Sequence, residues 1–453
     1  VPERPRPVPA VDTFRSYQEE AAAMAVTSGG LLLADDVGVG KTHSALATLT
    51  YEGRLPAVWV TLAHLIPQAR AAFAKVLPSI RVHVASKTSP PDDIDMLLDG
   101  TDLVLLNYHK IAGWQYHLRD WARTVIFDEA HELRREKSQK YQAAANIADA
   151  ASVRLGLTAT PIYNYGDEMH NILDILRPGA LGDRSEFLLE WGGGARGVSD
   201  PRALGSYLRD QGLMLRRTRK DVGRELPPVQ EIIHTISIDS AEVDALADAE
   251  HLARTILANV SDDTGDLFRA HGEFDYRMRL ATGVAKARTV AAFTAMLAEA
   301  EPVVLYGWHH EVYDIWATEF ARAGFYPAFY TGRESLSQKE ANKARFLNGE
   351  TNLLIMSLRA GAGLDGLQER SSVVVFGEFD WSPSMHIQDI GRLARDGQPL
   401  DRPVVAYYVA ADEGVKERQA RPILDPNLPL TAAKVNNTDR VRAMAKAYLD
   451  RHL

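Results

Sequence analysis

The stretch DDVGVGKTHSALATL near the N-terminus has the composition and spacing of a loop that binds phosphate. An apolar segment precedes a turn that contains Gly38 and Gly40, and Lys41 and Thr42 then open a helix-like segment. In such a loop, backbone N–H groups bind phosphate, the lysine reaches the terminal phosphates, and the threonine hydroxyl binds Mg²⁺. Asp35 stands where the usual pattern GxxxxGK(S/T) has its first glycine, so an ordinary strand-turn-helix with a surface lysine is the alternative.

Two adjacent carboxylates end the apolar stretch VIFDEAH, residues 125–131. We expect Asp128 to hold Mg²⁺ through water and Glu129 to polarise the attacking water, because the two tasks differ in geometry. A strand end capped by solvated acids is the alternative. The phosphate loop earlier in the same alternating region favours the catalytic interpretation.

Two arginines lie three residues apart in QDIGRLARDGQ, residues 388–398. On a helix this spacing puts Arg392 and Arg395 on one face. Arginines supplied across a cleft stabilise the charge on a transferring phosphoryl group, so both are candidate catalytic residues. The alternative is a basic surface helix.

The elements that must position these residues follow an alternating pattern. Short apolar runs alternate with amphipathic stretches from residue 31 to about 160, and the same rhythm restarts near 302, which is typical of parallel strands joined by crossover helices. The predicted fold class is therefore α/β, with two parallel-sheet lobes and helical insertions between them, and the two prolines of LPPVQ mark the crossover. The expected domains are lobe 1 at 1–230 with a helical insertion at about 180–212, a helical insertion or hinge at 231–297, lobe 2 at 298–412, and a C-terminal helical extension at 413–453.

Composition narrows the class of protein. The 453 residues are 46% apolar and 25% charged, which is typical of a globular protein with real cores. The absence of cysteine excludes disulfides, thiolate nucleophiles and Cys-ligated zinc. No apolar run approaches the roughly 20 residues of a membrane span, so we expect a cytoplasmic protein with no membrane partner. The abundance of Ala, Arg, Asp and Val favours a GC-rich bacterial or phage genome.

The charge pattern gives little direct evidence of nucleic-acid binding. A net charge of −9 argues against a protein coated in nucleic acid, although RREK at 134–137 and RRTRK at 216–220 are locally basic. Each run alone is interpreted as a solvated face. The adjacent His309 and His310 do not have the spacing of metal ligands, and we expect Trp308 to pack in a core rather than stack on bases.

The motifs occur in an order that resembles the Swi/Snf-type branch of helicase superfamily two, from FRSYQ to YYVA. Members of that branch commonly have a phosphate loop like DEMGLGKT, so the resemblance implies that Asp35 belongs there. The most diagnostic stretch is LMLRRTRKDVGRELPPVQ, residues 213–230, which is similar to the branch's LRR-T-DV-ELPP segment. GVAKARTVAAFTAML followed by Gly-Trp-His-His is similar to the HepA-related annealing-helicase branch. The chain departs from the family pattern at Asp365, where Asn is common, and at Ala394, where His is common.

The resemblance implies roles for further residues. Gln18 matches the glutamine that reads adenine, and Gly363 and Asp365 fall in the motif that completes the nucleotide site. Contact with a phosphodiester backbone, and its coupling to the nucleotide site, are assigned to residues of the TATP motif, of the two motifs in lobe 2, and of the DEAH motif: Thr158, Thr160, Ser357, Arg359, Gln388 and His131.

The function implied is an ATP-dependent DNA translocase. Two RecA-like lobes would close on ATP and Mg²⁺ and open after hydrolysis, moving a monomer along duplex or branched DNA through sequence-independent backbone contacts, with RNA as an alternative partner. A strand-separating DNA or RNA helicase is the first alternative. A nucleotide-gated nucleic-acid-binding scaffold with a vestigial ATPase is another, which the full set of expected catalytic residues disfavours.

Overall fold

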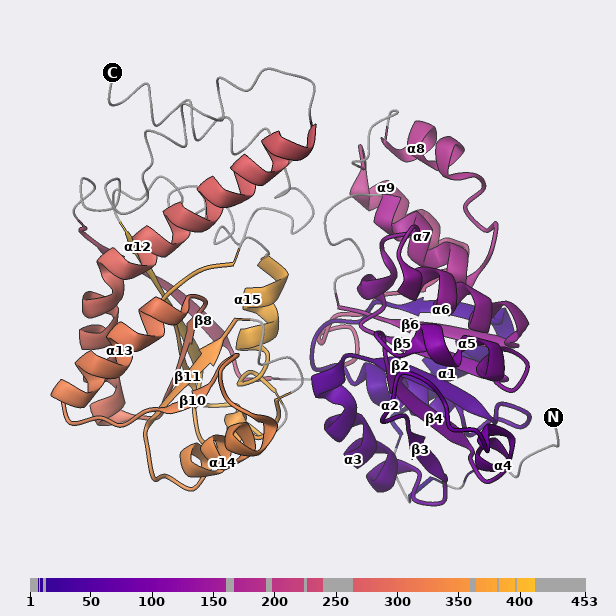
Figure 1. Cartoon of the computed structure of the whole chain (residues 1–453), viewed down its shortest axis with the longest axis horizontal. Coiled ribbons are helices and arrows are strands. Elements are labelled where there is room, and N and C mark those ends of the chain that lie inside the picture. The colour runs from indigo at the N-terminus through magenta and orange to yellow at the C-terminus, as the bar shows by residue number, and fades with distance from the viewer. Residues whose placement is uncertain are drawn as a thin grey trace. The chain divides into compact units, whose positions relative to one another are not determined.

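The computed structural model describes residues 7, 9–10, 14–159, 167–192, 198–223, 226–238, 264–358, 364–380, 383–395 and 397–411, with backbone alone at 264–275, 383 and 384. The chain divides into two compact units, Val1–Glu225 and Leu226–Leu453 (Figure 1). Each unit contains its own sheet and its own cores.

Unit 1 is built on a sheet in which every described strand pair is parallel. Its described strands follow the order β3-β4-β2-β5-β6-β1-β7. The central strands are apolar and buried on both faces, as expected for a parallel sheet covered by crossover helices. The strands are β1 Gly30–Leu33, β2 Ala57–Thr61, β3 Val82–Val84, β4 Leu103–Asn107, β5 Thr124–Asp128, β6 Val153–Leu157 and β7 Met214–Leu215.

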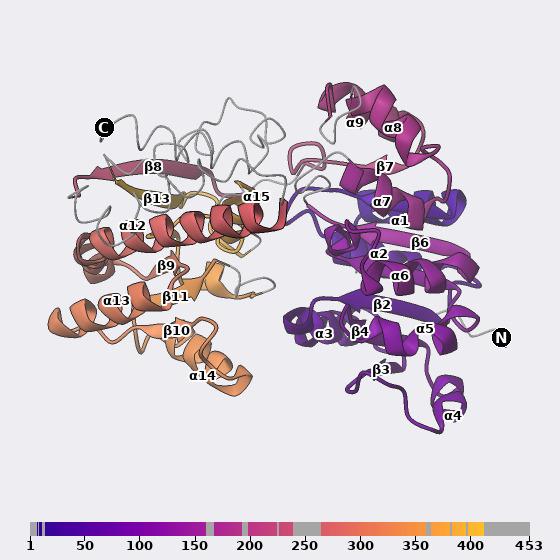
Figure 2. The same cartoon turned by 45° about the horizontal axis from the view of Figure 1, so that its top comes forward.

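Helices cover both faces of this sheet because alternate strand residues point to opposite sides. Leu31 and Leu33 of β1 pack on one side with α1 Ser16–Ser28, α2 Lys41–Thr48 and α3 Ile66–Val76. Leu32 packs on the other side with the remaining helices. Figure 2 gives a second view of the sheet and its helices. The remaining helices are α4 Ile94–Asp99, α5 Ile111–Arg119, α6 Gln139–Ala150, α7 Asp167–Leu176, α8 Arg184–Gly192 and α9 Pro201–Asp210, and the short 3₁₀ turns are η1 Ala63–Leu65 and η2 Ala130–Leu133.

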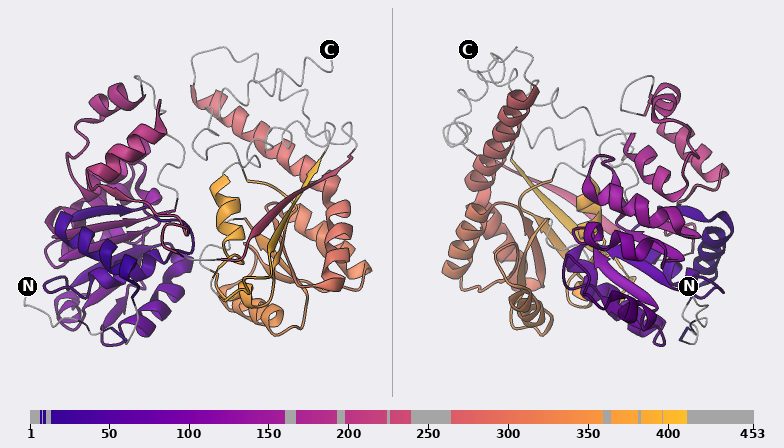
Figure 3. Two further views of the ribbon diagram at one scale, coloured as in Figure 1. Left: turned by 180° about the vertical axis from the view of Figure 1, so that it is seen from behind. Right: turned by 45° about the vertical axis from the view of Figure 1, so that its right-hand side comes forward.

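Unit 2 repeats the same plan with the described strand order β10-β11-β9-β12-β13-β8, again with every described pair parallel. Its long helices α12 and α13 cover one face of the sheet, and α14 and α15 contribute to the other (Figure 3). The strands are β8 Val229–Ile236, β9 Val303–Gly307, β10 Ala328–Tyr330, β11 Leu353–Ser357, β12 Val373–Phe376 and β13 Val404–Ala411. The helices are α12 Thr264–Ala300, α13 His310–Arg322, α14 Leu336–Leu347 and α15 Pro383–Ile390, with the 3₁₀ turn η3 Leu367–Glu369.

The predicted fold class is confirmed, because both units are α/β with parallel sheets. One element differs from expectation. The segment expected to form a helical insertion or hinge, 231–297, begins instead as a strand, because β8 continues to Ile236 and pairs along its whole length with β13. β8 forms an edge of the described sheet, and its residues Val229, Ile232 and Ile233 are exposed. An edge strand of this kind does not need the continuous apolar run by which a buried strand is predicted from sequence. No described helix combines the length and apolar character needed to cross a membrane.

Candidate nucleotide site

The phosphate loop joins the end of β1 to the start of α2. Gly38 and Gly40 adopt φ values of 83° and 99°, which residues with a side chain rarely adopt. A Cβ atom at Gly40 would also lie 2.5 Å from Nε2 of Gln18, so the two residues are in direct contact. The structure thus brings Gln18, predicted to read adenine, against the phosphate loop.

Lys41 fills the interior of this loop. Its Nζ donates to the backbone carbonyls of Asp35, at 2.7 Å, and Asp36, at 3.2 Å. Burial lowers the pKa of Lys41, while Glu129 and other nearby carboxylates act in the opposite direction. Thr42 follows in the first turn of α2, where its hydroxyl is predicted to bind Mg²⁺.

Asp128 ends β5 with its carboxylate held from a neighbouring strand. Oδ2 accepts a hydrogen bond from Oγ1 of Thr61, at 3.0 Å, and the hydroxyl of Tyr108 donates to the backbone carbonyl of Asp128, at 2.8 Å. Burial, together with the adjacent charge of Glu129, raises the pKa of Asp128 to about 7, and the Thr61 contact opposes that rise. A divalent cation would favour the ionised form of such a carboxyl.

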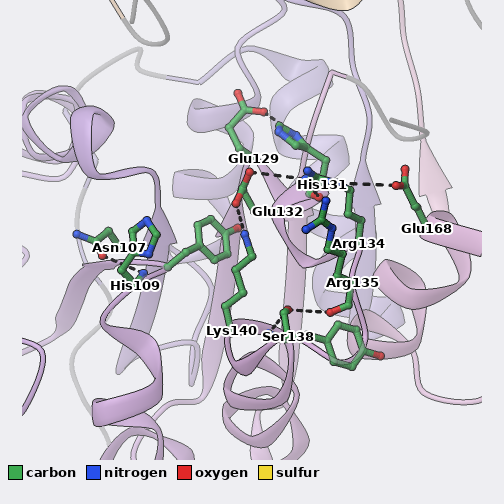
Figure 4. A network of polar contacts seen from close by, with 12 residues as sticks. Asn107, His109, Glu129, His131, Glu132, Arg134, Arg135, Ser138, Lys140 and Glu168 are labelled. Atoms are coloured by element: carbon green, nitrogen blue, oxygen red, sulfur yellow. Dashed lines mark hydrogen bonds and ion pairs between the residues drawn. The ribbon is translucent and has the colours of Figure 1, made fainter. Parts of the chain in front are cut away.

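Glu129 has an unusual backbone for a glutamate. Its φ of 55° and ψ of 52° lie in the left-handed region, where strain commonly marks functional residues. Burial alone would raise the pKa of Glu129, but the contact with His131, and then the charge of Lys41, hold it below its ordinary value. Nδ1 of His131 lies 3.2 Å from Oε2 of Glu129 (Figure 4). The same nitrogen lies 3.5 Å from Oγ1 of Thr158. The structure therefore connects three predicted site residues: Glu129, His131 and Thr158.

The basic run after the DEAH motif is partly built into the fold. Arg134 lies between two carboxylates, 3.7 Å from Glu132 and 3.8 Å from Glu168 of α7, and Glu132 also pairs with Lys140 (Figure 4). Asn171 donates to the backbone carbonyl of Arg134. These contacts tie the segment after β5 to α6 and α7, so Arg134 is not part of a freely solvated face.

Asp35 is a fully buried carboxylate with an arginine partner. Arg217 donates to it from its backbone N–H (2.8 Å), from Nε (3.2 Å) and from Nη2 (2.6 Å). Arg217 belongs to the RRTRK run, so this run too serves an internal purpose rather than forming a plain solvated face. The aspartate at the position usually occupied by glycine is thus paired rather than left as an isolated charge.

The described candidate residues of unit 2 are held within that unit. Arg392 is buried and donates from Nε to Oδ1 of Asp389, at 3.1 Å, while Arg395 pairs with Asp365. Ser357 ends β11 and Gln388 lies in α15. Three further predicted residues lie outside the described ranges: Thr160, Arg359 and Gly363.

The sequence alone did not identify several residues whose side chains hydrogen-bond to the site residues and hold them in place. Thr61 and Tyr108 hold Asp128, and Arg217 holds Asp35. Thr61 ends β2, which pairs in parallel with β5, so the rule that neighbouring parallel strands end at one edge would have placed Thr61 near Asp128. Arg217 has no comparable local signal, because it pairs with a residue 182 positions away.

The residues present fit a magnesium-bound nucleotide. Gly40 lets the loop backbone approach Gln18 closely, because a Cβ there would lie 2.5 Å from Nε2 of Gln18, and the charges of Glu129 and Asp128 act to raise the pKa of Lys41 against the effect of burial. Among the described residues, no group of three or more metal-ligating side chains is gathered. Proteins usually hold Mg²⁺ through one or two side chains together with substrate phosphates. Thr42 and Asp128 would hold the ion.

Two models of known protein families match the chain. The SNF2-related domain matches residues 17–278, and the helicase conserved C-terminal domain matches residues 286–397. The chain belongs to the SNF2-related family. The predicted Swi/Snf branch of helicase superfamily two is therefore confirmed.

Individual relatives are distant. One is the SWI/SNF-related matrix-associated actin-dependent regulator of chromatin subfamily A-like protein 1 of Xenopus tropicalis, 24% identical over 87% of this chain and 42% of that protein. Its Caenorhabditis elegans homologue is 24% identical over 88% of this chain and 59% of that protein. The chain thus spans about half the length of these relatives. A solved structure, the Sulfolobus solfataricus SWI2/SNF2 ATPase core in complex with dsDNA, aligns over 99% of this chain and 97% of that chain at 19% identity, with a TM-score of 0.45.

Proposed function

We propose that this member of the SNF2-related family is an ATP-dependent DNA translocase of the Swi/Snf type. The observation that carries the proposal is the convergence of Gln18, Lys41 and the carboxylates of the DEAH motif on one phosphate loop in unit 1. These side chains come from separate parts of the sequence. Their meeting supports a nucleotide hydrolase rather than a strand-turn-helix with a surface lysine.

Each residue of unit 1 has a distinct part in the proposed reaction. Lys41 would exchange the carbonyls of Asp35 and Asp36 for the terminal phosphates of ATP. Glu129 would orient the attacking water through its ionised carboxylate, the form that the contact with His131 favours by lowering the pKa. Bound Mg²⁺ supplies charge neutralisation on the phosphates.

We assign the two arginines of unit 2 to transition-state stabilisation. Arg392 and Arg395 would bind the transferring phosphoryl group when the two lobes close during turnover, and this closure would couple hydrolysis to movement. The lobe boundaries proposed are 1–230 and 298–412. β5 and β11 are mainly apolar strands that end in the polar residues Asp128 and Ser357, which supports a nucleotide site at strand ends.

We further propose that the track is duplex or branched DNA, held through its phosphodiester backbone. Thr158 follows β6, Ser357 ends β11, and His131 links Thr158 to Glu129. A hydroxyl at this position could bind phosphate and report it to the catalytic glutamate without reading bases. Placement in the annealing-helicase branch, action as a monomer, and RNA as a second partner are finer proposals of the same kind.

The function is tested by measuring ATP hydrolysis with no polynucleotide, single-stranded DNA, duplex DNA, forked DNA and RNA, alongside strand-displacement and strand-annealing assays. Stimulation by duplex or forked DNA without strand displacement is expected. Displacement would favour the strand-separating helicase, stimulation by RNA alone would replace DNA as the track, and nucleotide binding without hydrolysis would favour the scaffold.

Variants of the site test the assignment of residues. Lys41→Ala and Glu129→Gln should each lower kcat by at least about 100-fold while the thermal midpoint stays near that of the wild type. The exposed Lys75 of α3 and Glu186 of α8 provide matched controls as Lys75→Ala and Glu186→Gln. Near wild-type turnover by either site variant would refute the assignment.

A further inference from the structure

The segment that carries RRTRK runs beside the phosphate loop. β7 pairs in parallel with β1, and the pairing continues past both strands, because the N–H of Ala34 donates to the carbonyl of Leu215 at 2.7 Å and that of Asp36 to the carbonyl of Arg217 at 3.0 Å. The loop therefore leaves the sheet with a second backbone alongside it. This backbone is the last part of unit 1 before unit 2 begins at residue 226.

The guanidinium group of Arg217 is hydrogen-bonded to residues of unit 1 through each of its nitrogens. Besides its contacts with Asp35, its Nη1 donates to the backbone carbonyl of Tyr17, at 2.6 Å, and its guanidinium carbon lies 5.3 Å from the centre of the Tyr17 ring. Nε, Nη1 and Nη2 all have partners within unit 1. Arg217 is therefore placed to support the loop rather than to touch a nucleotide.

Two further side chains hold the loop by its carbonyl oxygens. Nε of Arg219 donates to the carbonyl of Val37, and the hydroxyl of Tyr17 donates to the carbonyl of Val39, both at 2.8 Å. In a trans peptide the C=O and the following N–H point in opposite directions. Fixing these two carbonyls thus directs the N–H groups of Gly38 and Gly40 away from Arg219 and Tyr17. Backbone N–H groups of this kind bind phosphate in such loops.

We propose that Tyr17, Arg217 and Arg219 form a loop clamp, a set of positioning residues that fixes the phosphate loop in its nucleotide-binding geometry. The proposal rests on the proposed function, because it concerns the same nucleotide. Asp35 is part of the arrangement. Its buried carboxylate anchors Arg217, and loss of either partner leaves an uncompensated buried charge.

The clamp is tested with substitutions that spare the buried charge. Arg217→Lys keeps the cation opposite Asp35 but loses the planar fork that reaches three acceptors. Arg219→Met removes the donor to Val37 and keeps an unbranched side chain. Lys220→Ala, at the exposed end of the same basic run, is the matched control. The readouts are Kd for a fluorescent ADP analogue, KM and kcat for ATP with duplex DNA, and the thermal midpoint of the full chain.

Arg217→Lys and Arg219→Met should each raise Kd for the ADP analogue and KM for ATP about tenfold, the factor expected from losing a charge-assisted hydrogen bond. We expect kcat to change less than KM, because the clamp shapes the bound state rather than contacting the reacting atoms. Lys220→Ala should behave as the wild type.

Wild-type Kd and KM in both variants would overturn the clamp, as would a Kd that rises only in step with loss of folded protein in the thermal scan. The ADP analogue separates this result from failure of the proposed function. A wild-type chain that binds the analogue but hydrolyses no ATP would refute the translocase while leaving the effect of the clamp on Kd measurable.

Discussion

Nη1 of Arg395 donates to Oδ1 of Asp365 over 2.7 Å, so a proposed catalytic arginine is paired with a carboxylate of its own unit. The same carboxylate oxygen accepts from the N–H of Gly366, at 3.0 Å. Partial burial would raise the pKa of Asp365, but the charge of Arg395 and these hydrogen bonds lower it below its ordinary value. The resemblance to the Swi/Snf branch leads to the expectation of Asn at the position of Asp365. The pairing therefore adds a charge that competes with phosphate for Arg395.

Asp365→Asn should raise kcat, because Arg395 would no longer have to leave an ion pair before it binds a phosphoryl group. The gain should not exceed about fivefold, since the Asp365 side chain is 58% exposed and solvent-exposed ion pairs contribute only about 1 kcal/mol or less. Steady-state ATPase assays with duplex DNA measure the change. Asp314→Asn, which removes the exposed carboxylate paired with Arg333 in the same unit, is the control. A lower kcat for Asp365→Asn would show instead that the pair holds Arg395 in its productive position.

Arg395→Ala should lose most ATP hydrolysis while retaining nucleotide binding. A transition-state arginine contributes roughly 1,000-fold or more to kcat but little to ground-state affinity. Single-turnover hydrolysis and binding of a fluorescent ADP analogue measure the two quantities separately. Arg333→Ala removes a more exposed arginine of the same unit, also paired with a carboxylate, and should have no effect on either. Hydrolysis by Arg395→Ala within a few-fold of the wild type would remove it from the catalytic set.

Thr61→Val should raise the Mg²⁺ concentration required for half-maximal ATPase activity by about tenfold. Thr61 donates to Oδ2 of Asp128, and loss of a group that orients a metal ligand commonly costs that much in metal affinity. The measurement is a magnesium titration at saturating ATP. Thr48→Val is the matched control, because Thr48 is also buried but donates only to the carbonyl of Ser44 within α2. An unchanged magnesium requirement would mean that Thr61 serves packing alone.

Site residues could be predicted from the sequence where they occur in local motifs, but not where their partners lie far away along the chain. Lys41, Asp128 and Glu129 occur in local motifs whose strand-to-loop context is visible along the chain, and the structure brings them together. The partner of Asp35 was not predictable in this way, because Arg217 reaches it only through the pairing of β7 with β1. The charge of the RRTRK run alone therefore predicted a solvated face.

The fold was predictable for a similar reason, with one exception. Buried parallel strands are continuous apolar runs, so their alternation with amphipathic helices identified both α/β units. β8 has mostly exposed side chains and lies at an edge, and only its pairing with β13 makes it a strand. The neighbouring sequence is rich in helix formers, which is why a helical insertion was expected there.

Asp389 should make the stability of the protein depend on pH. Burial raises its pKa from 3.8 to about 7, with Arg392 opposing the rise and Asp380 adding to it. The folded state therefore binds more protons than the unfolded state between about pH 4 and pH 7, and the free energy of unfolding contributed by this group falls as pH rises through that window. Asp389→Asn should remove this component, which is on the order of 4 kcal/mol at most.

Urea unfolding at several pH values between 4 and 8 measures the effect as a slope, so a general loss of stability from leaving Arg392 without its partner does not obscure it. His386, three residues earlier in α15, provides a comparison of opposite sign, because burial lowers its pKa from 6.5 to about 4. Its contribution is present above about pH 6.5 and is lost as pH falls, so His386→Gln should flatten the acid side of the profile instead. Identical slopes for Asp389→Asn and the wild type would contradict the raised pKa of Asp389.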